Sequence, residues 1–392
     1  MKKYTLLFLL PLFLFSDCKN NSKNIGGSIV ENNAPFYKRL VGTVGDKSTK
    51  LNLTCTIESS ALGKTTNYSG FYYSVDDVES HRVSGVGDSL GGIKLTVWDN
   101  DDESAISFEG KFTNAQTFTG NFIDTILKTK LPFNLVENYA DALELMPTGL
   151  SDSIKLFKNV EGSPIATFDI NLLMPKNSSK DVADFLIPQI LKIPESINLS
   201  DDDDDKQLKK IPVFKDAAAL MQAHRDSFFA MYRDDFKDEK PNANNEYFAM
   251  NFANSTSMDV MYNEKNILSL AVFNYNFEGG AHGNHGTSLV SYNWADKKVI
   301  TLNDVFVSDY KPILNKALET SLRKKFKLAA KDSLSNVLFD NKIEATDNFC
   351  IAHKGILFMY NPYEIASYAV GEIDLFIPFV EIKQVLNPSL KF

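Results

Sequence analysis

The sequence predicts an α+β fold, in which an all-β meander or barrel-like region precedes an antiparallel sheet packed with helices. Short segments of alternating apolar residues recur with turns about every 8–12 residues over residues 36–137. Apolar residues at helical spacing are found in residues 214–236 and 309–330, in the second half of the chain. The chain also holds 29 Phe and 15 Tyr, and aromatic residues favour strands.

Length and charge narrow the classes of function. A chain of 392 residues is too long for one ordinary core, so we expect two or three domains. A hydrophobic content of 44% with 23% charged residues is typical of a folded soluble protein. The formal charge of -9 argues against a nucleic-acid partner, because phosphate binding requires clustered Lys and Arg.

The N-terminus has the pattern of a bacterial lipoprotein signal peptide over residues 1–18. Two lysines precede an apolar run that is too short to cross a bilayer, and Cys18 follows directly. We expect Cys18 to be lipidated, residues 19–35 to be a polar tether and the protein to be anchored in the cell envelope, periplasmic or at the cell surface. The alternative is an ordinary signal peptide with an incidental cysteine. Two further cysteines, Cys55 and Cys350, are expected as buried free thiols, although a disulfide between them stays open.

The first region is predicted to be all β over residues 36–137. The expected strands cover residues 51–57, 70–75, 81–85, 93–98, 106–112 and 117–122, with an acidic turn at residues 99–103. Residues 138–153 are expected to be a connector at which the chain divides into two parts that fold alone.

Residues 154–392 are predicted to form the α+β part. The expected strands are residues 154–160, 165–173, 255–262, 267–277, 287–294, 349–352, 356–360 and 370–380. The expected helices are residues 181–190, 214–236 and 309–330, the last capped by Asp309. The five aspartates at residues 201–205 indicate a solvated loop, because they lack the spaced ligands and glycine turn of a calcium loop.

The glycine-rich loop after residue 277 is the first candidate site. His282 and His285 are spaced as His-x-x-His, but a zinc site needs at least three protein ligands, and only Glu278 lies nearby. We therefore favour a structural role for this loop, in which the glycines permit positive φ and His282 closes the loop by a hydrogen bond. No metal and no cofactor are predicted.

The sequence shows no enzyme motif. It has no Gly-x-Ser-x-Gly elbow, phosphate loop or dinucleotide fingerprint, so no catalytic residue is predicted. The acidic residues that a glycosidase-like pair would draw on are Glu278, Glu364, Glu372 and Asp374.

A second loop carries Asn361, Pro362, Tyr363 and Glu364, and tyrosine is enriched at binding hot spots. We predict that this loop and the glycine-rich loop lie side by side and form one recognition patch. Its predicted residues are Glu278, Gly279, Gly280, His282, Asn361, Tyr363 and Glu364. The alternative is that both loops serve only the architecture.

Three segments also resemble a known family. They are Phe-Glu-Gly-Gly-Ala-His at residues 277–282, Val-Ile-Thr-Leu-Asn-Asp-Val-Phe at residues 299–306, and the run at residues 355–368 that contains Asn-Pro-Tyr-Glu-Ile-Ala. They resemble the extracytoplasmic domain shared by the anti-sigma factor RsiV and the accessory region of the deacetylase PdaC, over residues 150–390. In the RsiV branch this domain binds lysozyme; in the PdaC branch it accompanies a catalytic domain.

The resemblance implies a binding protein. No sigma-binding segment or deacetylase motif is recognisable, so we expect a non-enzymatic, lipid-anchored envelope protein that binds a lysozyme-like protein or a peptidoglycan fragment. The alternative is an enzyme that acts on cell-wall polysaccharide through acidic residues near the glycine-rich loop. A scaffold that only holds partners apart is the third possibility.

Overall fold

The computed structural model describes residues 34–60, 63–98, 105–193, 214–241 and 250–388. The expected signal peptide with Cys18, most of the tether, the acidic turn and the aspartate run lie outside these residues. Among the helices that are described, none has the length and apolarity that crossing a membrane requires.

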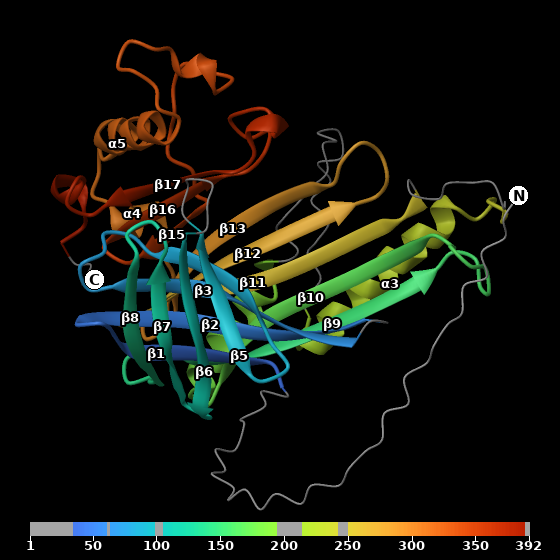
Figure 1. The fold of residues 1–392 in the computed structure, drawn as a ribbon. Helices are drawn as coiled ribbons and strands as arrows, with labels where there is room; N and C mark the ends of the chain where they lie inside the picture. The colour runs from blue at the N-terminus through green and yellow to red at the C-terminus, as the bar shows by residue number, and fades with distance from the viewer. Residues whose placement is uncertain (1–33, 61–62, 99–104, 194–213, 242–249, 389–392) are drawn as a thin grey trace, which may run out of the picture.

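Residues 36–137 form a closed eight-stranded barrel in which neighbouring strands pair antiparallel and β8 pairs with β1 (Figure 1). The strands are β1 (Phe36–Val44), β2 (Lys47–Ser60), β3 (Gly63–Ser74), β4 (His81–Gly87), β5 (Gly92–Trp98), β6 (Ile106–Asn114), β7 (Thr117–Asp124) and β8 (Thr129–Glu137). The alternating apolar residues predicted from the sequence point inward and pack together, as in Leu51, Leu95 and Phe108, which are 0% exposed. The barrel-like prediction is confirmed.

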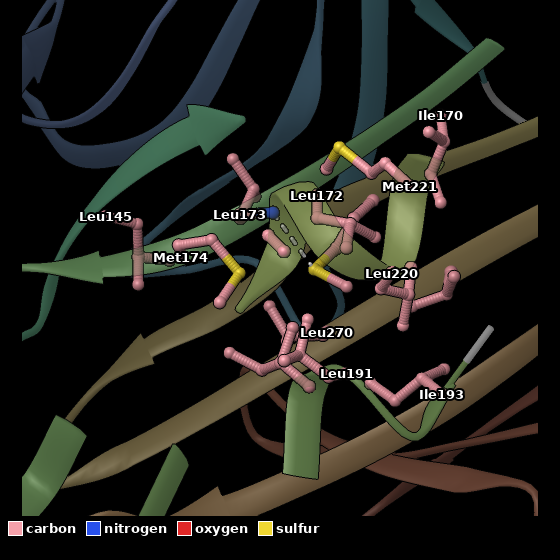
Figure 2. Close-up of a cluster of buried hydrophobic side chains, with 14 of the residues drawn as sticks. Leu145, Ile170, Leu172, Leu173, Met174, Leu191, Ile193, Leu220, Met221 and Leu270 are labelled. Atoms are coloured by element: carbon pink, nitrogen blue, oxygen red, sulfur yellow. Dashed lines mark hydrogen bonds between the residues drawn. The ribbon is translucent and has the colours of Figure 1, made fainter. Parts of the chain in front are cut away.

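A six-stranded sheet follows, in the order β14-β13-β12-β11-β10-β9. Its strands are β9 (Glu144–Lys155), β10 (Ile165–Lys176), β11 (Phe252–Glu264), β12 (Ile267–Phe277), β13 (Asn284–Asn293) and β14 (Lys298–Val299). Helices α1 (Lys180–Ile190) and α3 (Ala217–Asp235) pack on one face of the sheet. Figure 2 shows this core, in which Leu172, Leu220 and Leu270 are fully buried.

A three-stranded sheet packs against β12 and β13. It consists of β15 (Phe349–Ala352), β16 (Gly355–Tyr360) and β17 (Ile373–Pro378). Its outer face is covered by α4 (Leu302–Val305) and α5 (Lys311–Lys325), whose apolar side chains include Leu314, Leu318 and Leu322. Short 3-10 turns η2 (Leu334–Asn336), η3 (Tyr368–Val370) and η4 (Lys383–Val385) complete this part.

Polar contacts fasten the barrel to the six-stranded sheet. The Glu264 carboxylate at the end of β11 is 4% exposed and accepts hydrogen bonds from Tyr73 at 2.7 Å, Arg39 at 3.3 Å and Lys50, all three from the barrel. The neighbouring Asn263 donates to the Tyr37 hydroxyl at 3.0 Å. The barrel and the sheet therefore share a buried interface.

The α+β prediction fits broadly, but several details are wrong. The strand expected at residues 154–160 ends at Lys155, and bends and turns follow it. The larger sheet is not purely antiparallel: β10 and β11 are parallel, because the chain crosses over through α1 and α3 between them. Most of the expected connector at residues 138–153 belongs to β9, whose largely exposed residues hide the strand pattern. The helix expected to start at Asp309 starts at Lys311, because Asp309 has a φ of +64° and cannot act as its cap.

Candidate functional site

The glycine-rich loop joins β12 to β13. Gly279 and Gly280 both have a φ of +85°, which glycine adopts without strain. A Cβ at Gly280 would meet nothing within 4 Å, so conformation and not close packing requires glycine there. Glu278 is exposed and accepts a hydrogen bond from Asn276 Nδ2 at 2.8 Å.

Tyr368 in η3 holds this loop in place. Its hydroxyl donates to the Gly283 carbonyl oxygen at 2.6 Å. Its ring stacks on the His282 ring, with centroids 3.9 Å apart and planes 18° apart. His282 Nδ1 also lies 3.1 Å from this carbonyl oxygen, but that oxygen belongs to the next residue in the chain, so the contact does not span the loop. The closure of the loop by His282 stays a prediction. Gly283 itself is packed tightly, because a Cβ there would lie 2.5 Å from the Tyr275 ring.

In the second loop, the side chains of two predicted binding residues accept hydrogen bonds from backbone N–H groups. The Asn361 side-chain oxygen accepts from the Thr287 N–H on β13 at 2.7 Å. The Glu364 carboxylate accepts from the Asn361 N–H at 2.9 Å. Tyr363 instead projects outward: it is 48% exposed, has a φ of +69° and lies with its ring 5.7 Å from the Tyr368 ring.

The two loops therefore lie side by side, joined through Tyr368. We call the three rings His282, Tyr363 and Tyr368 the aromatic patch. The sequence interpretation singled out the first two and missed Tyr368, although the residue ends the third of the segments that carry the family resemblance. A half-buried tyrosine between two loops has no local sequence signal, because its partners in the glycine-rich loop, His282 and Gly283, are about 85 residues away.

A cleft of about 460 Å³ opens where the barrel meets both sheets. We call it the junction cleft. Its apolar floor is formed by Met261, Leu289 and Met359, which come from β11, β13 and β16. Its aromatic sides are the half-buried rings of Phe71, Phe273 and Phe376, and Trp98 lies at the barrel side, 56% exposed.

Two carboxyl groups of unusual environment line the junction cleft. Asp259 on β11 accepts from Ser69 Oγ at 2.6 Å, and burial raises the pKa of its carboxyl. Glu372 accepts from Thr287 Oγ1 at 2.9 Å, and burial likewise raises the pKa of that carboxyl. Among the described residues neither forms an ion pair, whereas Asp374 pairs with Lys325 at 2.6 Å. Sequence reasoning identified Glu372 and Asp374 as candidates but not Asp259, which looks like an ordinary strand residue.

The aromatic patch and the junction cleft are connected. The His285 ring lies 5.6 Å from the Tyr368 ring and 6.1 Å from the Phe273 ring, and Phe273 lines the cleft. A row of rings thus runs from exposed Tyr363 to the cleft wall.

Metal binding and cysteine chemistry have little support in the described part of the chain. No group of three or more His, Cys, Asp or Glu side chains is placed there to hold a metal ion. Cys55 and Cys350 are buried free thiols, as predicted. Burial raises the pKa of Cys55 to about 11 and that of Cys350 further, so neither thiol is activated as a nucleophile.

Two family profiles match parts of the chain. The one described as "Deacetylase PdaC" matches residues 186–285, and the one described as "Protein of unknown function (DUF3298)" matches residues 303–380. The predicted similarity to the PdaC accessory region is confirmed at this level. The first match contains the glycine-rich loop and Asp259, and the second contains Tyr363, Tyr368 and Glu372.

One solved structure shows a shared fold. The chain is similar to the crystal structure of a DUF3298 family member from Bacteroides fragilis, with a TM-score of 0.53 and 22% identity over 64% of this chain and 96% of that chain. A DUF3298 family protein from Pseudomonas aeruginosa matches with a TM-score of 0.42 and 18% identity over 62% and 95% of the two chains. No curated protein matches.

Proposed function

We propose that this protein is a non-enzymatic, lipid-anchored cell-envelope protein that binds a lysozyme-like protein or a peptidoglycan fragment through the aromatic patch. The observation that carries the proposal is the patch itself: two loops from separate family matches present His282 and Tyr363, both exposed, next to the Tyr368 ring. The match to a family named for a deacetylase supports a role at the cell wall.

The patch has the physical properties of a binding hot spot. Tyr368 is held by its hydrogen bond to Gly283, and the Tyr363 N–H donates to the Ala366 carbonyl oxygen at 3.0 Å. Rings that are already ordered lose little conformational entropy on binding. Aromatic rings also suit both classes of partner, since they contact the C–H face of a sugar or an apolar protein side chain. Glu278 and the net charge of -9 favour a basic protein surface.

The deciding experiment measures binding of lysozyme and of soluble peptidoglycan fragments by calorimetry, with thermal melting as the check on folding. Tyr363→Ala is expected to lose about 2 kcal/mol of binding free energy with little change in melting temperature. The control is Ile126→Ala, which removes an exposed apolar side chain (74%) from the barrel, away from the patch, and should leave binding unchanged. Normal binding by Tyr363→Ala contradicts the proposal.

The anchor rests on the sequence alone, because Cys18 lies outside the described residues. In the same preparations, Cys18→Ser should move the protein from the membrane fraction to the soluble fraction. A variant that stays with the membranes argues for another mode of attachment.

A second candidate function, an enzyme that acts on cell-wall polysaccharide, is favoured by one observation. Asp259 and Glu372 line the same cleft, and burial raises the pKa of both, as is needed for a general acid. Glu278 and Glu364 do not line it. Release of reducing sugars from purified peptidoglycan, lost in Glu372→Gln, would support an enzyme; no release by the wild-type protein would exclude that activity.

A further inference from the structure

The junction cleft has a charge that its own side chains do not balance. Four acidic side chains line it, against one arginine, Arg82. Asp374 is paired with Lys325, but within the described residues no ion pair reaches Asp259 or Glu372. Arg82 is exposed, and its charge only partly offsets the burial of these two carboxyls. A half-buried carboxylate without a cation is costly, so a positively charged ligand group is the natural partner.

The other side chains that line the cleft indicate what the uncharged part of such a ligand is. Phe71, Phe273 and Phe376 offer ring surfaces, which suit the C–H face of a pyranose. Ser257 and Thr287 place hydroxyl groups among them. Ser80 Oγ is buried and has no hydrogen-bond partner among the described residues, so it is available to a ligand hydroxyl.

The size of the cleft agrees with a ligand of this kind. Small-molecule sites commonly measure about 300–1,000 Å³ and combine apolar walls with a few polar groups. The cleft, at about 460 Å³, has a floor of three apolar side chains, of which two are the adaptable residues Met261 and Met359. One or two sugar rings fit this description better than an extended polymer.

We propose that the junction cleft binds a sugar that carries free amino groups, with its ammonium groups held by the Asp259 and Glu372 carboxylates and its rings packed against the aromatic side chains. An N-acetylated sugar has no positive charge and adds nothing to the partial compensation that Arg82 provides. The cleft adjoins the aromatic patch through His285, but none of the three patch residues lines it, and this proposal does not depend on the function proposed for the patch.

The test uses the full chain and a matched pair of probes, the glucosamine disaccharide and its di-N-acetylated form, in calorimetric titrations. The free disaccharide is expected to bind at least about tenfold more tightly than the acetylated one. Glu372→Gln and Asp259→Asn keep the acceptor oxygen for Thr287 and Ser69 and should each weaken binding about tenfold. Glu161→Gln, which removes an exposed carboxylate outside the cleft, is the charge-matched control and should bind normally.

Each other result overturns the proposal. If the acetylated disaccharide binds as tightly as the free one or more tightly, the cleft does not recognise the amino groups. If 1,5-diaminopentane binds as tightly as the free disaccharide, the cleft recognises positive charge and not a sugar. No binding of the glucosamine disaccharide, or full binding by both carboxyl variants, excludes the site. Tyr363→Ala should leave the affinity for the disaccharide unchanged. A result that overturns the proposal for the cleft can therefore be told apart from one that overturns the proposal for the aromatic patch.

Discussion

At the scale of single residues, Glu372 combines a structural cost with a candidate role. Its carboxyl is half-buried at the start of β17, beside Thr287. Burial raises its pKa, while His285 and Arg82 act in the opposite direction and Asp374 adds to the rise. Folding therefore favours the protonated form. This contribution to stability is fully present below the pKa of the unfolded chain and is lost as the pH rises through the folded pKa.

We therefore expect Glu372→Gln to stabilise the protein at pH 7.5, with a rise in melting temperature of about 1–3 °C. The amide keeps an acceptor for Thr287 and removes the charge. Below about pH 4 the difference should vanish, because Glu372 is then protonated in both states. Melting curves from pH 3.5 to 8 test this, with Glu161→Gln as control. A difference that does not change with pH would contradict the assigned cause.

At the scale of elements, the loop between β12 and β13 uses glycine for two different reasons. Gly280 needs only a positive φ, whereas Gly283 lies against the Tyr275 ring and offers its carbonyl oxygen to Tyr368. The second residue therefore sets the position of the aromatic patch, and the first sets only the turn.

The pair Gly283→Ala and Gly280→Ala separates these reasons. Gly280→Ala should cost about 1 kcal/mol of stability and leave binding intact, because the strain stays within an exposed turn. Gly283→Ala should cost about 1–3 kcal/mol and also weaken binding at the patch, because the Tyr275 ring or the loop backbone must shift. Urea unfolding and the binding titration measure both effects. If the two variants behave alike, the contact at Gly283 does not position the patch.

At the scale of the whole molecule, the barrel is held to the six-stranded sheet by Glu264. This carboxylate neutralises Arg39 and Lys50, and desolvation opposes but does not overcome their lowering of its pKa. Beside it, the Leu143 N–H, just before β9, donates to Asn263 Oδ1 at 2.9 Å. The predicted division into two parts that fold alone stays a prediction, and these contacts indicate that the parts remain docked in the intact chain.

Glu264→Ala is expected to destabilise the protein by about 3–5 kcal/mol, because buried Arg39 loses a partner and Lys50 is left without one. Asp76→Ala breaks the exposed Lys47–Asp76 pair, 3.8 Å apart, and should cost less than about 1 kcal/mol. Urea unfolding compares the two. Limited proteolysis within residues 138–143 should become faster only in Glu264→Ala. Equal stability of both variants would mean that Glu264 does not dock the barrel.

The parts of the fold that the sequence predicted are those with a strong local period. The strand around Leu51, the helix around Leu220 and the loop at Gly279 each show their structure within about ten residues. β9 was missed because its outer face is polar. The parallel pairing of β10 with β11 was missed because the local sequence does not indicate whether the next strand returns parallel or antiparallel.

The sequence by itself therefore determined the barrel-like region, the α+β class of the second part and the existence of the two loops that carry His282 and Tyr363. Only the tertiary structure brought Tyr368 between those loops and placed Ser80, Asp259 and Glu372 around one cleft. The physical reason is distance along the chain: these three residues are separated by more than a hundred positions each. Their meeting depends on how three sheets pack, which non-local contacts such as Glu264 with Lys50 decide.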